Sequence, residues 1–307
     1  MDRWPLTTPA ADAVERAFGA DRAAVDGALR RICADALEVL PPRVAEAIRY
    51  CVLGEGKRLR PLLVLAAYRA CGGTQDASAL GAAVELVHTY SLVHDDLPCM
   101  DDDDVRRGRP TTHRRHGVQI AAAAGVVMVP LAVRAAADAA RALGLPADAR
   151  GAIVRELMRA SGAGGMVGGQ LLDLAGEGRD LSVAELERVH SAKTGALIAA
   201  SVRIGGIAAS ATTPSAAALD RYGRAVGLAF QIADDVLDAT ATTAQLGKTA
   251  GRDAARGKRT YPALLGVAGA VDRAAALARE ACAALHEADL LTPALGRLAE
   301  FIVERTS

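Results

Sequence analysis

The chain has 307 residues, a formal net charge of zero, 51% hydrophobic residues and 3% aromatic residues. Because the charge is balanced, nothing predicts a surface for nucleic acid or for an anionic membrane, and we expect no nucleic-acid partner. The five cysteines are scattered without CxxC spacing, and the first residues lack a basic-then-apolar leader, which favours reduced thiols in a cytoplasmic protein.

Nearly every long segment predicts helix. Residues 10–24 and 131–143, for example, combine strong helix formers with apolar residues at three-to-four spacing, and no alternating strand pattern or linker is present. The uncharged stretch 117–133 is shorter than ~20 residues and contains Pro130, so we expect a buried helix and no membrane span. The pattern predicts one all-α domain over residues 1–307, with the helices arranged around a central cavity.

The first chemically informative segment is an apolar helix that leads into the carboxylates Asp95, Asp96 and Asp101. Pro98 interrupts regular helix there, so a bend or a helix end must bring Asp101 back beside Asp96. His88 lies two helical turns before Asp95, which places an imidazole and a carboxylate on one wall. A histidine on an apolar face is equally compatible with ordinary core packing.

A second acidic motif, Asp234, Asp235 and Asp238, follows another apolar helical stretch. On a helix, Asp234 and Asp238 differ by about 40° and Asp235 falls within the same ~100° arc. Carboxylates that share one face repel each other unless cations neutralise them, and oxygen ligands without Cys or His indicate Mg²⁺. Solvated helix ends are the alternative, but the apolar flanks of both motifs argue against it.

Basic residues accompany the two acidic motifs. They are Lys57, Arg60, Arg106, Arg107, Lys193, Lys248 and Lys258. Each alone would be read as surface charge. Beside two predicted Mg²⁺ motifs they predict two diphosphate pockets, one reached through metal and one held directly by Arg and Lys.

Two glycine-rich segments do not match phosphate-binding loops. Gly247-Lys248-Thr249 lacks the Walker-A glycine because position 242 is Thr, and residues 162–169 follow a helix where a dinucleotide fingerprint would follow a strand. We expect the second segment to allow close helix packing or a kink, with Gln170 and Asp173 one turn apart on the following face.

The motifs, in this order, resemble the trans-isoprenyl diphosphate synthase family over essentially the whole chain, and bacterial farnesyl and geranylgeranyl diphosphate synthases in particular. The matching segments are Gly56-Lys57-Arg58-Leu59-Arg60-Pro61, Asp95-Asp96 with Asp101 and Arg106-Arg107-Gly108, Gly168-Gly169-Gln170 with Asp173, Lys193-Thr194-Gly195, Phe230-Gln231 with Asp234-Asp235 and Asp238, Gly247-Lys248-Thr249 with Gly251, and Gly257-Lys258 with Tyr261-Pro262. The resemblance implies an all-α isoprenoid-synthase bundle, usually a homodimer, that condenses isopentenyl diphosphate with an allylic diphosphate.

The resemblance also implies a role for each matching position. Three Mg²⁺ ions on the allylic diphosphate would be held by Asp95, Asp96, Asp101, Asp234 and Asp235, with Asp238 as an outer ligand. The same diphosphate would be contacted by Arg106, Lys193, Lys248 and Lys258. Isopentenyl diphosphate would be held by Lys57, Arg60, His88 and Arg107. Thr194 and Gln231 would face the reacting carbons.

Product length is the least determined property. Tyr90, followed by Ser91, lies five residues before Asp95, about 7.5 Å down the same helix. An aromatic residue here resembles the C15-forming members of the family, although core packing of Tyr90 is the alternative. The family's usual Gly-Asp-Ala-Leu is replaced by Gly125-Val126-Val127-Met128, which with the small residues 121–124 would open space for a C20 product. We predict farnesyl diphosphate, with geranylgeranyl diphosphate as the alternative.

Two other functions compete with a prenyl diphosphate synthase. A class I terpene cyclase shares the implied fold and Mg²⁺ chemistry, but it needs no isopentenyl diphosphate site and usually relies on aromatic side chains, which are scarce here. A non-catalytic synthase subunit should have lost one aspartate motif, whereas this chain keeps both.

Overall fold

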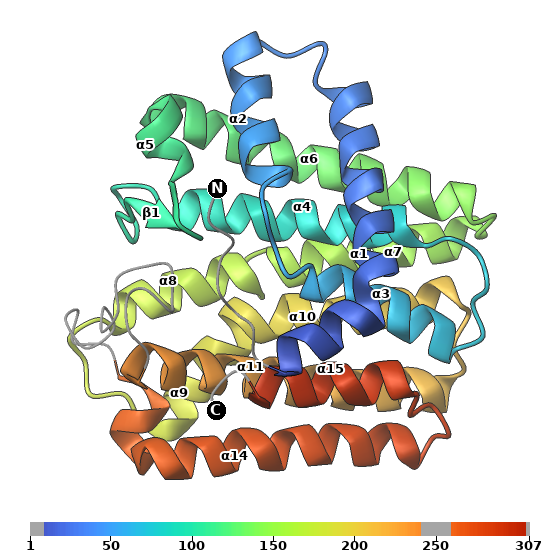
Figure 1. Cartoon of the computed structure of the whole chain (residues 1–307), viewed down its shortest axis with the longest axis vertical. Coiled ribbons are helices and arrows are strands. Elements are labelled where there is room, and N and C mark those ends of the chain that lie inside the picture. Colours follow the sequence, from blue (N-terminus) through green and yellow to red (C-terminus); the bar gives the residue numbers. More distant parts are fainter. Residues whose placement is uncertain (1–8, 241–258, 305–307) are drawn as a thin grey trace.

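The computed structural model describes residues 9–240 and 259–304, and in this part of the chain the elements are almost all helices (Figure 1). In chain order they are α1 (Pro9–Ala36), α2 (Pro42–Val52), α3 (Leu59–Ala70), α4 (Ser78–Asp95), β1 (Val105–Arg106), β2 (Arg109–Pro110), α5 (Thr112–His116), α6 (Val118–Ala142), α7 (Ala147–Ser161), α8 (Met166–Gly176), α9 (Val183–His190), η1 (Ser191–Gly195), α10 (Ala196–Ala208), α11 (Thr213–Thr240), α14 (Tyr261–His286) and α15 (Pro293–Glu304). The all-α prediction is confirmed.

The short antiparallel pair β1–β2 is the one departure from helix among the described residues. Its turn is formed by Arg107 and Gly108, whose φ angles of 53° and 72° are both in the left-handed region. Two successive residues with positive φ match the two-residue hairpin turn that suits the twist of paired strands. The hairpin therefore presents Arg106 and Arg107 on a tight turn beside the end of α4.

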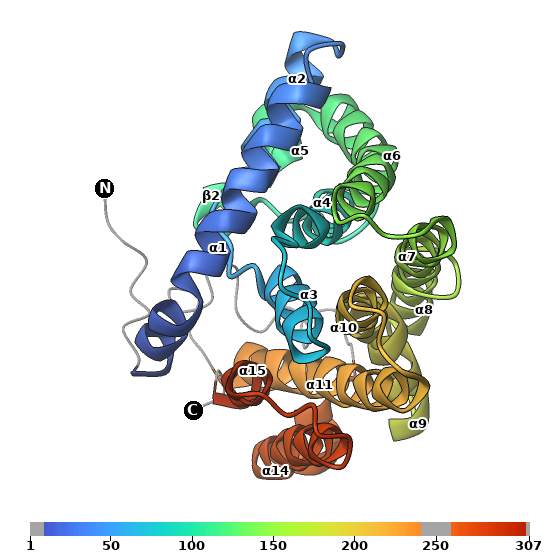
Figure 2. The ribbon, with the colours of Figure 1, turned by 90° about the vertical axis from the view of Figure 1, so that its right-hand side faces the viewer.

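Helices α3 and α10 pack against each other in the middle of the molecule, as Figure 2 shows. Both contribute side chains to two hydrophobic cores. The first core is shared with α1, α2, α4, α6 and α7, and the second with α11, α14 and α15. The chain thus forms two packed layers on either side of a central helix pair.

Helices α4 and α11, which carry the two aspartate motifs at their C-terminal ends, run in the same direction through the bundle (Figure 1). Their final turns lie on the same side of the molecule as the β1–β2 hairpin and α8. Two motifs separated by more than a hundred residues therefore reach one end of the bundle.

Helix α6 is, within the described residues, the one helix that is long and apolar enough to cross a membrane when judged by length and composition. In the bundle it packs along α4 and also contacts α2, α5 and α7. Its residues Ala121, Ala124 and Met128 are fully buried, whereas Val126 on the opposite face and Val118 at the start of the helix are exposed.

A π-helical turn, η1, joins α9 to α10. Helix α9 begins at a capping box in which Ser182 accepts a hydrogen bond from the backbone of Glu185 and the Glu185 side chain bonds back to Ser182. The π turn then inserts an extra residue into the helix, a distortion that is frequent at functional sites. It carries Lys193 and Thr194, two of the predicted site residues.

Candidate active site

The first aspartate motif leaves the helix where the sequence predicts. Helix α4 ends at Asp95, and the chain then curls back, so that the backbone nitrogen of Asp101 donates to the carbonyl oxygen of Asp95 at 2.7 Å. The backbone nitrogen of Asp102 donates to the carbonyl oxygen of Leu97 at 3.1 Å, closing the same turn. The predicted return of Asp101 toward the start of the motif is confirmed.

The carboxylate of Asp95 lies in a crowded, charged environment. Its pKa is raised to about 6, chiefly by burial; Asp101 and Asp96 also raise it, while Lys193 and Arg106 act in the opposite direction. Lys193 donates to Asp173 on α8 at 2.7 Å, and Asp173, Asp95 and Asp101 together raise the pKa of its amine against the effect of burial. Helices α4 and α8 and the turn η1 therefore meet around Lys193.

Asp96 is engaged by an arginine. Its buried carboxylate accepts hydrogen bonds from Arg106 Nε at 2.9 and 3.0 Å and from Arg106 Nη2 at 2.6 Å. This is the two-pronged geometry that makes an arginine–carboxylate pair strong and directional. The predicted metal ligand Asp96 and the predicted diphosphate contact Arg106 thus bind each other. A bound diphosphate would either share Arg106 with Asp96 or replace Asp96 as its partner.

The second motif continues a regular helix, because α11 extends to Thr240 and the three carboxylates share one stretch of its surface. Asp234 is partly exposed, while Asp235 and Asp238 are buried. Asp235 Oδ1 accepts from Gln231 Nε2 at 3.1 Å, and Asp235 Oδ2 accepts from the backbone nitrogen of Tyr261 at 3.1 Å. The metal roles of all three carboxylates remain predictions.

Thr194 and Gln231 are brought together as predicted for residues of one site. Thr194 Oγ1 donates to Gln231 Oε1 at 2.7 Å, and Gln231 in turn donates to Asp235. The close approach of their helices depends on glycine, because a Cβ at Gly227 would lie 2.8 Å from the Cα of Gly195. This hydrogen-bonded chain ties η1 to the second aspartate motif.

Glycine-rich residues 162–169 act as a packing surface, as the sequence predicts. A Cβ at Gly169 would collide with the backbone of Lys193, and a Cβ at Gly168 would collide with the carbonyl of Ala163. On the same helix, Asp173 reaches Lys193, while Gln170 is buried. The glycines therefore set the distance at which α8 supports η1.

Of the four residues assigned to isopentenyl diphosphate, Arg60, His88 and Arg107 lie together at a second, basic pole of the site. The pKa of His88 is well below its usual range because burial and then the guanidinium groups of Arg60, Arg107, Arg106 and Arg58 oppose its positive charge. Arg107 Nη1 also donates to the carbonyl oxygen of Glu55, in the loop that precedes Lys57. A neutral imidazole surrounded by guanidinium groups is suited to bind a polyanion.

Lys57 and Arg60 occupy the loop before α3 and the first turn of α3. The amine of Lys57 lies 5.6 Å from the ring centre of Phe301, and the guanidinium carbon of Arg60 lies 5.9 Å from the ring centre of Phe230. Lys248 and Lys258, which were assigned to the allylic diphosphate, lie outside the described residues.

Arg58 is a structural residue that the sequence analysis did not single out. It is 4% exposed, adopts a left-handed φ of 52°, and bonds to Asp26 at 2.8 Å and to Glu85 at 3.1 Å. It also donates to the carbonyl oxygens of residues 52 and 54. Arg58 thereby fixes the loop that carries Lys57. The only sequence signal was a positive charge between two other positive charges.

Tyr90 is placed beneath Asp95 and packs on another residue of α4. Its ring meets that of His94 edge-on, with centroids 4.9 Å apart, and His94 Nε2 bonds to the carbonyl oxygen of Ala122 on α6 at 3.1 Å. Burial and then Asp95 raise the pKa of Tyr90. Ser91 donates to the carbonyl oxygen of His88 at 2.8 Å.

The expectation that Val126 opens space beside Tyr90 is wrong for this chain. Val126 is 63% exposed on the outer face of α6. The α6 residues that face α4 are small, and Gly125 contacts the ring of His94 so closely that a Cβ would collide with it. Gly125 therefore lets α6 approach the ring of His94, against which Tyr90 packs.

The whole arrangement defines a helical-bundle enzyme site with an acidic pole and a basic pole for charged substrates. The polyprenyl synthetase family model matches residues 41–289, so the chain belongs to that family and is a prenyltransferase.

Known proteins support this assignment. The chain is 46% identical over 267 residues to farnesyl diphosphate synthase of Escherichia coli, covering 85% of this chain and 89% of that protein. It is 44% identical over 246 residues to geranylgeranyl pyrophosphate synthase 9 of Arabidopsis thaliana, covering 78% of this chain and 68% of that protein. A solved geranyltransferase of Helicobacter pylori, complexed with magnesium and isoprenyl diphosphate, superposes with a TM-score of 0.78 at 29% identity, covering 98% of this chain and 97% of that one.

Proposed function

We propose that this prenyltransferase condenses isopentenyl diphosphate head-to-tail with dimethylallyl and geranyl diphosphate, in a Mg²⁺-dependent reaction whose main product is farnesyl diphosphate. The observation that carries the proposal is the meeting of Asp95, Asp101 and Lys193 at one pole, next to the group of guanidinium side chains around His88. The name of the Escherichia coli relative agrees with a farnesyl product, and that of the Arabidopsis relative keeps geranylgeranyl diphosphate as the alternative.

The donor set of the acidic pole fits Mg²⁺. Burial is the main cause that raises the pKa of Asp95 to about 6, and Asp101 and Asp96 also raise it, so a hard cation beside these carboxylates would favour their charged form. Three ions would be held by Asp95, Asp96, Asp101, Asp234 and Asp235, with Asp238 outside them. When bound, Mg²⁺ stabilises the negative charge that develops on the departing diphosphate.

The chain's own residues position both substrates. Lys193 and Arg106 would contact the allylic diphosphate, whose bond to carbon C1 breaks with both electrons leaving on the diphosphate. Lys57, Arg60, His88 and Arg107 would hold isopentenyl diphosphate so that its double bond faces C1, which replaces a collision by a fixed geometry. After the carbon–carbon bond forms, the released diphosphate accepts the proton, so no separate general base is needed. Thr194 and Gln231 would border the reacting carbons.

Turnover of the purified chain tests this function. We expect products only when isopentenyl diphosphate and an allylic diphosphate are both supplied, with activity lost on chelation and restored by Mg²⁺. Asp95→Ala should lower turnover by about 100-fold or more, because a charge-stabilising group in the transition state is lost. Hydrocarbon release without isopentenyl diphosphate would favour a terpene cyclase, and no turnover of the chain alone would favour a non-catalytic subunit.

Product length is tested at Tyr90. Each isoprene unit buries about five more carbons, worth roughly 4 kcal/mol at ~0.8 kcal/mol per carbon, so affinity favours longer chains and a steric floor must stop elongation. Tyr90→Ala should therefore shift the product from C15 to C20 or longer, read by chromatography of the dephosphorylated products. An unchanged distribution would exclude Tyr90 as the floor, and C20 from the unmodified chain would favour the alternative.

We propose further that the enzyme is a cytoplasmic homodimer without a membrane span, joined through the outer face of α6. Val126 on this face is 63% exposed, the second most exposed of the large hydrophobic side chains described. Val126→Lys should convert the dimer to monomer in sedimentation velocity measurements, since it would bury an unpaired charge at the interface. A monomeric parent protein would contradict the dimer.

A further inference from the structure

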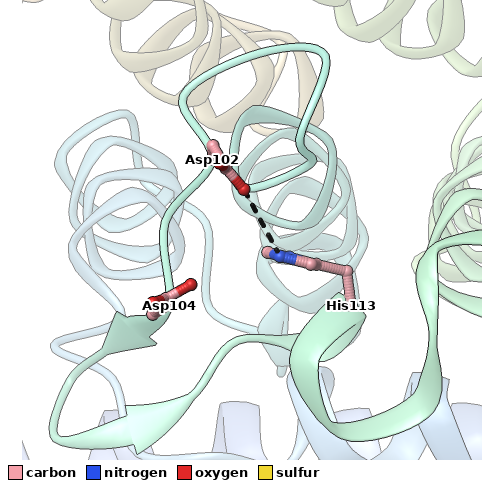
Figure 3. A group of neighbouring side chains, drawn as sticks. All are labelled: Asp102, Asp104 and His113. Atoms are coloured by element: carbon pink, nitrogen blue, oxygen red, sulfur yellow. Dashed lines mark ion pairs between the residues drawn. The ribbon is translucent and has the colours of Figure 1, made fainter.

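A carboxylate and imidazole group lies on the loop that follows the first aspartate motif. Asp102, Asp104 and His113 each offer a ligand atom, and these atoms all lie within 4.8 Å of one another (Figure 3). The backbone of Asp101 is hydrogen-bonded to Asp95, and the next residue, Asp102, adopts a left-handed φ of 47°. None of Asp102, Asp104 and His113 is among the residues proposed to bind Mg²⁺.

His113 is oriented like a metal ligand. Its side chain is 2% exposed, and Nδ1 lies 3.1 Å from Thr111 Oγ1. The Thr111 hydroxyl donates its own proton to the carbonyl oxygen of Asp103 at 2.7 Å, so it accepts from Nδ1–H. Nδ1 therefore carries a proton, and in the neutral imidazole the lone pair of Nε2 is then available to a metal ion.

The bare nitrogen points at the carboxylates. His113 Nε2 is buried and has no hydrogen-bond partner among the described residues, and it lies 4.0 Å from Asp102 Oδ1, as drawn in Figure 3. A metal-binding histidine typically has this arrangement, with its second nitrogen held by a protein hydrogen bond that fixes the tautomer. A buried, unsatisfied nitrogen is otherwise costly.

Arg114 holds the two carboxylates in this structure. Its Nε donates to Asp104 Oδ1, and its Nη2 lies 3.9 Å from Asp102 Oδ1. The two carboxylates thus share a single guanidinium. Arg114 is half exposed, so its side chain can swing into solvent when a divalent cation replaces it.

We propose that Asp102, Asp104 and His113 form a site for a divalent transition-metal ion of the Zn²⁺ class, separate from the Mg²⁺ sites. An imidazole nitrogen among the ligands suits Zn²⁺, Cu²⁺, Fe²⁺ or Ni²⁺ better than Mg²⁺. Ligands of a tetrahedral Zn²⁺ lie ~3.4 Å apart, given bonds of ~2.0–2.2 Å, so the ligand atoms must move together by up to about 1.4 Å. The exposed side chains of Asp102 and Asp104 leave room for that movement.

The ion would clamp the hairpin at both ends. Asp104 directly precedes β1, and His113 follows β2 in α5. The two ends are already joined by a hydrogen bond from the backbone nitrogen of Thr111 to the carbonyl oxygen of Asp104 at 2.9 Å. Because the hairpin carries Arg106 and Arg107, metal binding would steady two predicted diphosphate contacts.

Equilibrium dialysis of Zn²⁺ against the substrate-free full chain tests the site, with excess Mg²⁺ present to occupy the aspartate motifs. We expect the unmodified protein to bind one more Zn²⁺ per chain than His113→Ala or Asp104→Asn. His116→Ala, three residues later in α5 with its ring on Tyr50, is the matched control and should bind like the parent. Arg114→Ala should bind Zn²⁺ more tightly, by about tenfold, because a competing cation is removed.

Equal Zn²⁺ binding by the parent, His113→Ala and Asp104→Asn would overturn the proposal, as would weaker binding by Arg114→Ala. Should His113→Ala fail to fold, Asp104→Asn decides, since Asp104 is at the surface. Replacing Zn²⁺ by Co²⁺ gives a second readout independent of activity: the parent should show the visible absorption of a nitrogen-ligated, low-coordinate ion, and Asp104→Asn should lose it.

Discussion

Asp95 lies at the end of α4 beside Asp101, Lys193 and Arg106, where burial raises the pKa of its carboxyl group from 3.8 to about 6. The folded chain therefore binds more protons than the unfolded chain between these values, so the stability contributed by Asp95 is complete below pH 3.8 and is lost as the pH rises through about 6. The shift of the pKa from 3.8 to about 6 corresponds to about 3 kcal/mol of folding free energy.

We predict that Asp95→Asn removes the loss of stability that the parent protein shows as the pH rises. In Mg²⁺-free buffer, urea denaturation from pH 4 to pH 7 should show the parent losing stability relative to the variant as the pH rises, by about 1–3 kcal/mol in total. The sign follows because the variant has no carboxylate to ionise in the buried site. Parallel stability profiles for the two proteins would contradict the prediction.

Arg106 and Asp96 form the second residue-scale case. Asp96 is 3% exposed and accepts three hydrogen bonds from Arg106, so removing the guanidinium leaves a buried carboxylate without its partner. We expect Arg106→Ala to lower the free energy of unfolding by about 2–4 kcal/mol. Adding Asp96→Asn should restore most of it, because the buried charge is then gone. Additive losses in a double-mutant cycle would show that the pair is not coupled.

At the scale of elements, the contact between α8 and η1 decides where Lys193 lies. A Cβ at Gly169 would collide with the backbone of Lys193, so Gly169→Ala must push η1 away from α8. Displacing a catalytic group by about 1 Å typically costs about 100-fold in rate, which we expect in kcat for this variant.

Gly164→Ala is the matched control for Gly169→Ala, because a Cβ at Gly164 would meet no atom within 4 Å. It lies in the same glycine-rich segment and should keep the parent's kcat. If both variants kept full activity, close packing of α8 on η1 would not be needed to position Lys193.

The elements also show what local sequence can predict. Helix positions, the end of α4 before Pro98 and the shared face of Asp234 and Asp238 follow from periodicity and proline chemistry, and the structure has the helices as predicted. Which charges pair does not follow from local sequence. The contact of Arg106 with Asp96 and the burial of Arg58 depend on how distant segments pack, as does the outward position of Val126.

For the whole molecule, the central pair α3–α10 holds apart two layers that each supply one aspartate motif. The loop that carries Lys57 leads directly into α3. The predicted contacts to both substrates therefore lie on or next to the same helix pair. Lys193 lies in η1, which directly precedes α10, and Arg60 is in the first turn of α3. The packing of these two helices thus sets the spacing between the acidic and the basic pole.

Substitutions at the two poles should affect different steady-state kinetic constants. Arg60→Ala and Lys57→Ala should raise the KM for isopentenyl diphosphate about tenfold or more, since a hydrogen bond to a charged group is lost. Lys193→Ala should instead lower kcat, because the allylic diphosphate is where charge develops. Arg69→Ala, at the far end of α3 and paired with Asp21 at the surface, is the control and should change neither constant. If all three site variants raised both KM values equally, substrates would not be divided between two poles, and the bundle would hold them in one shared pocket.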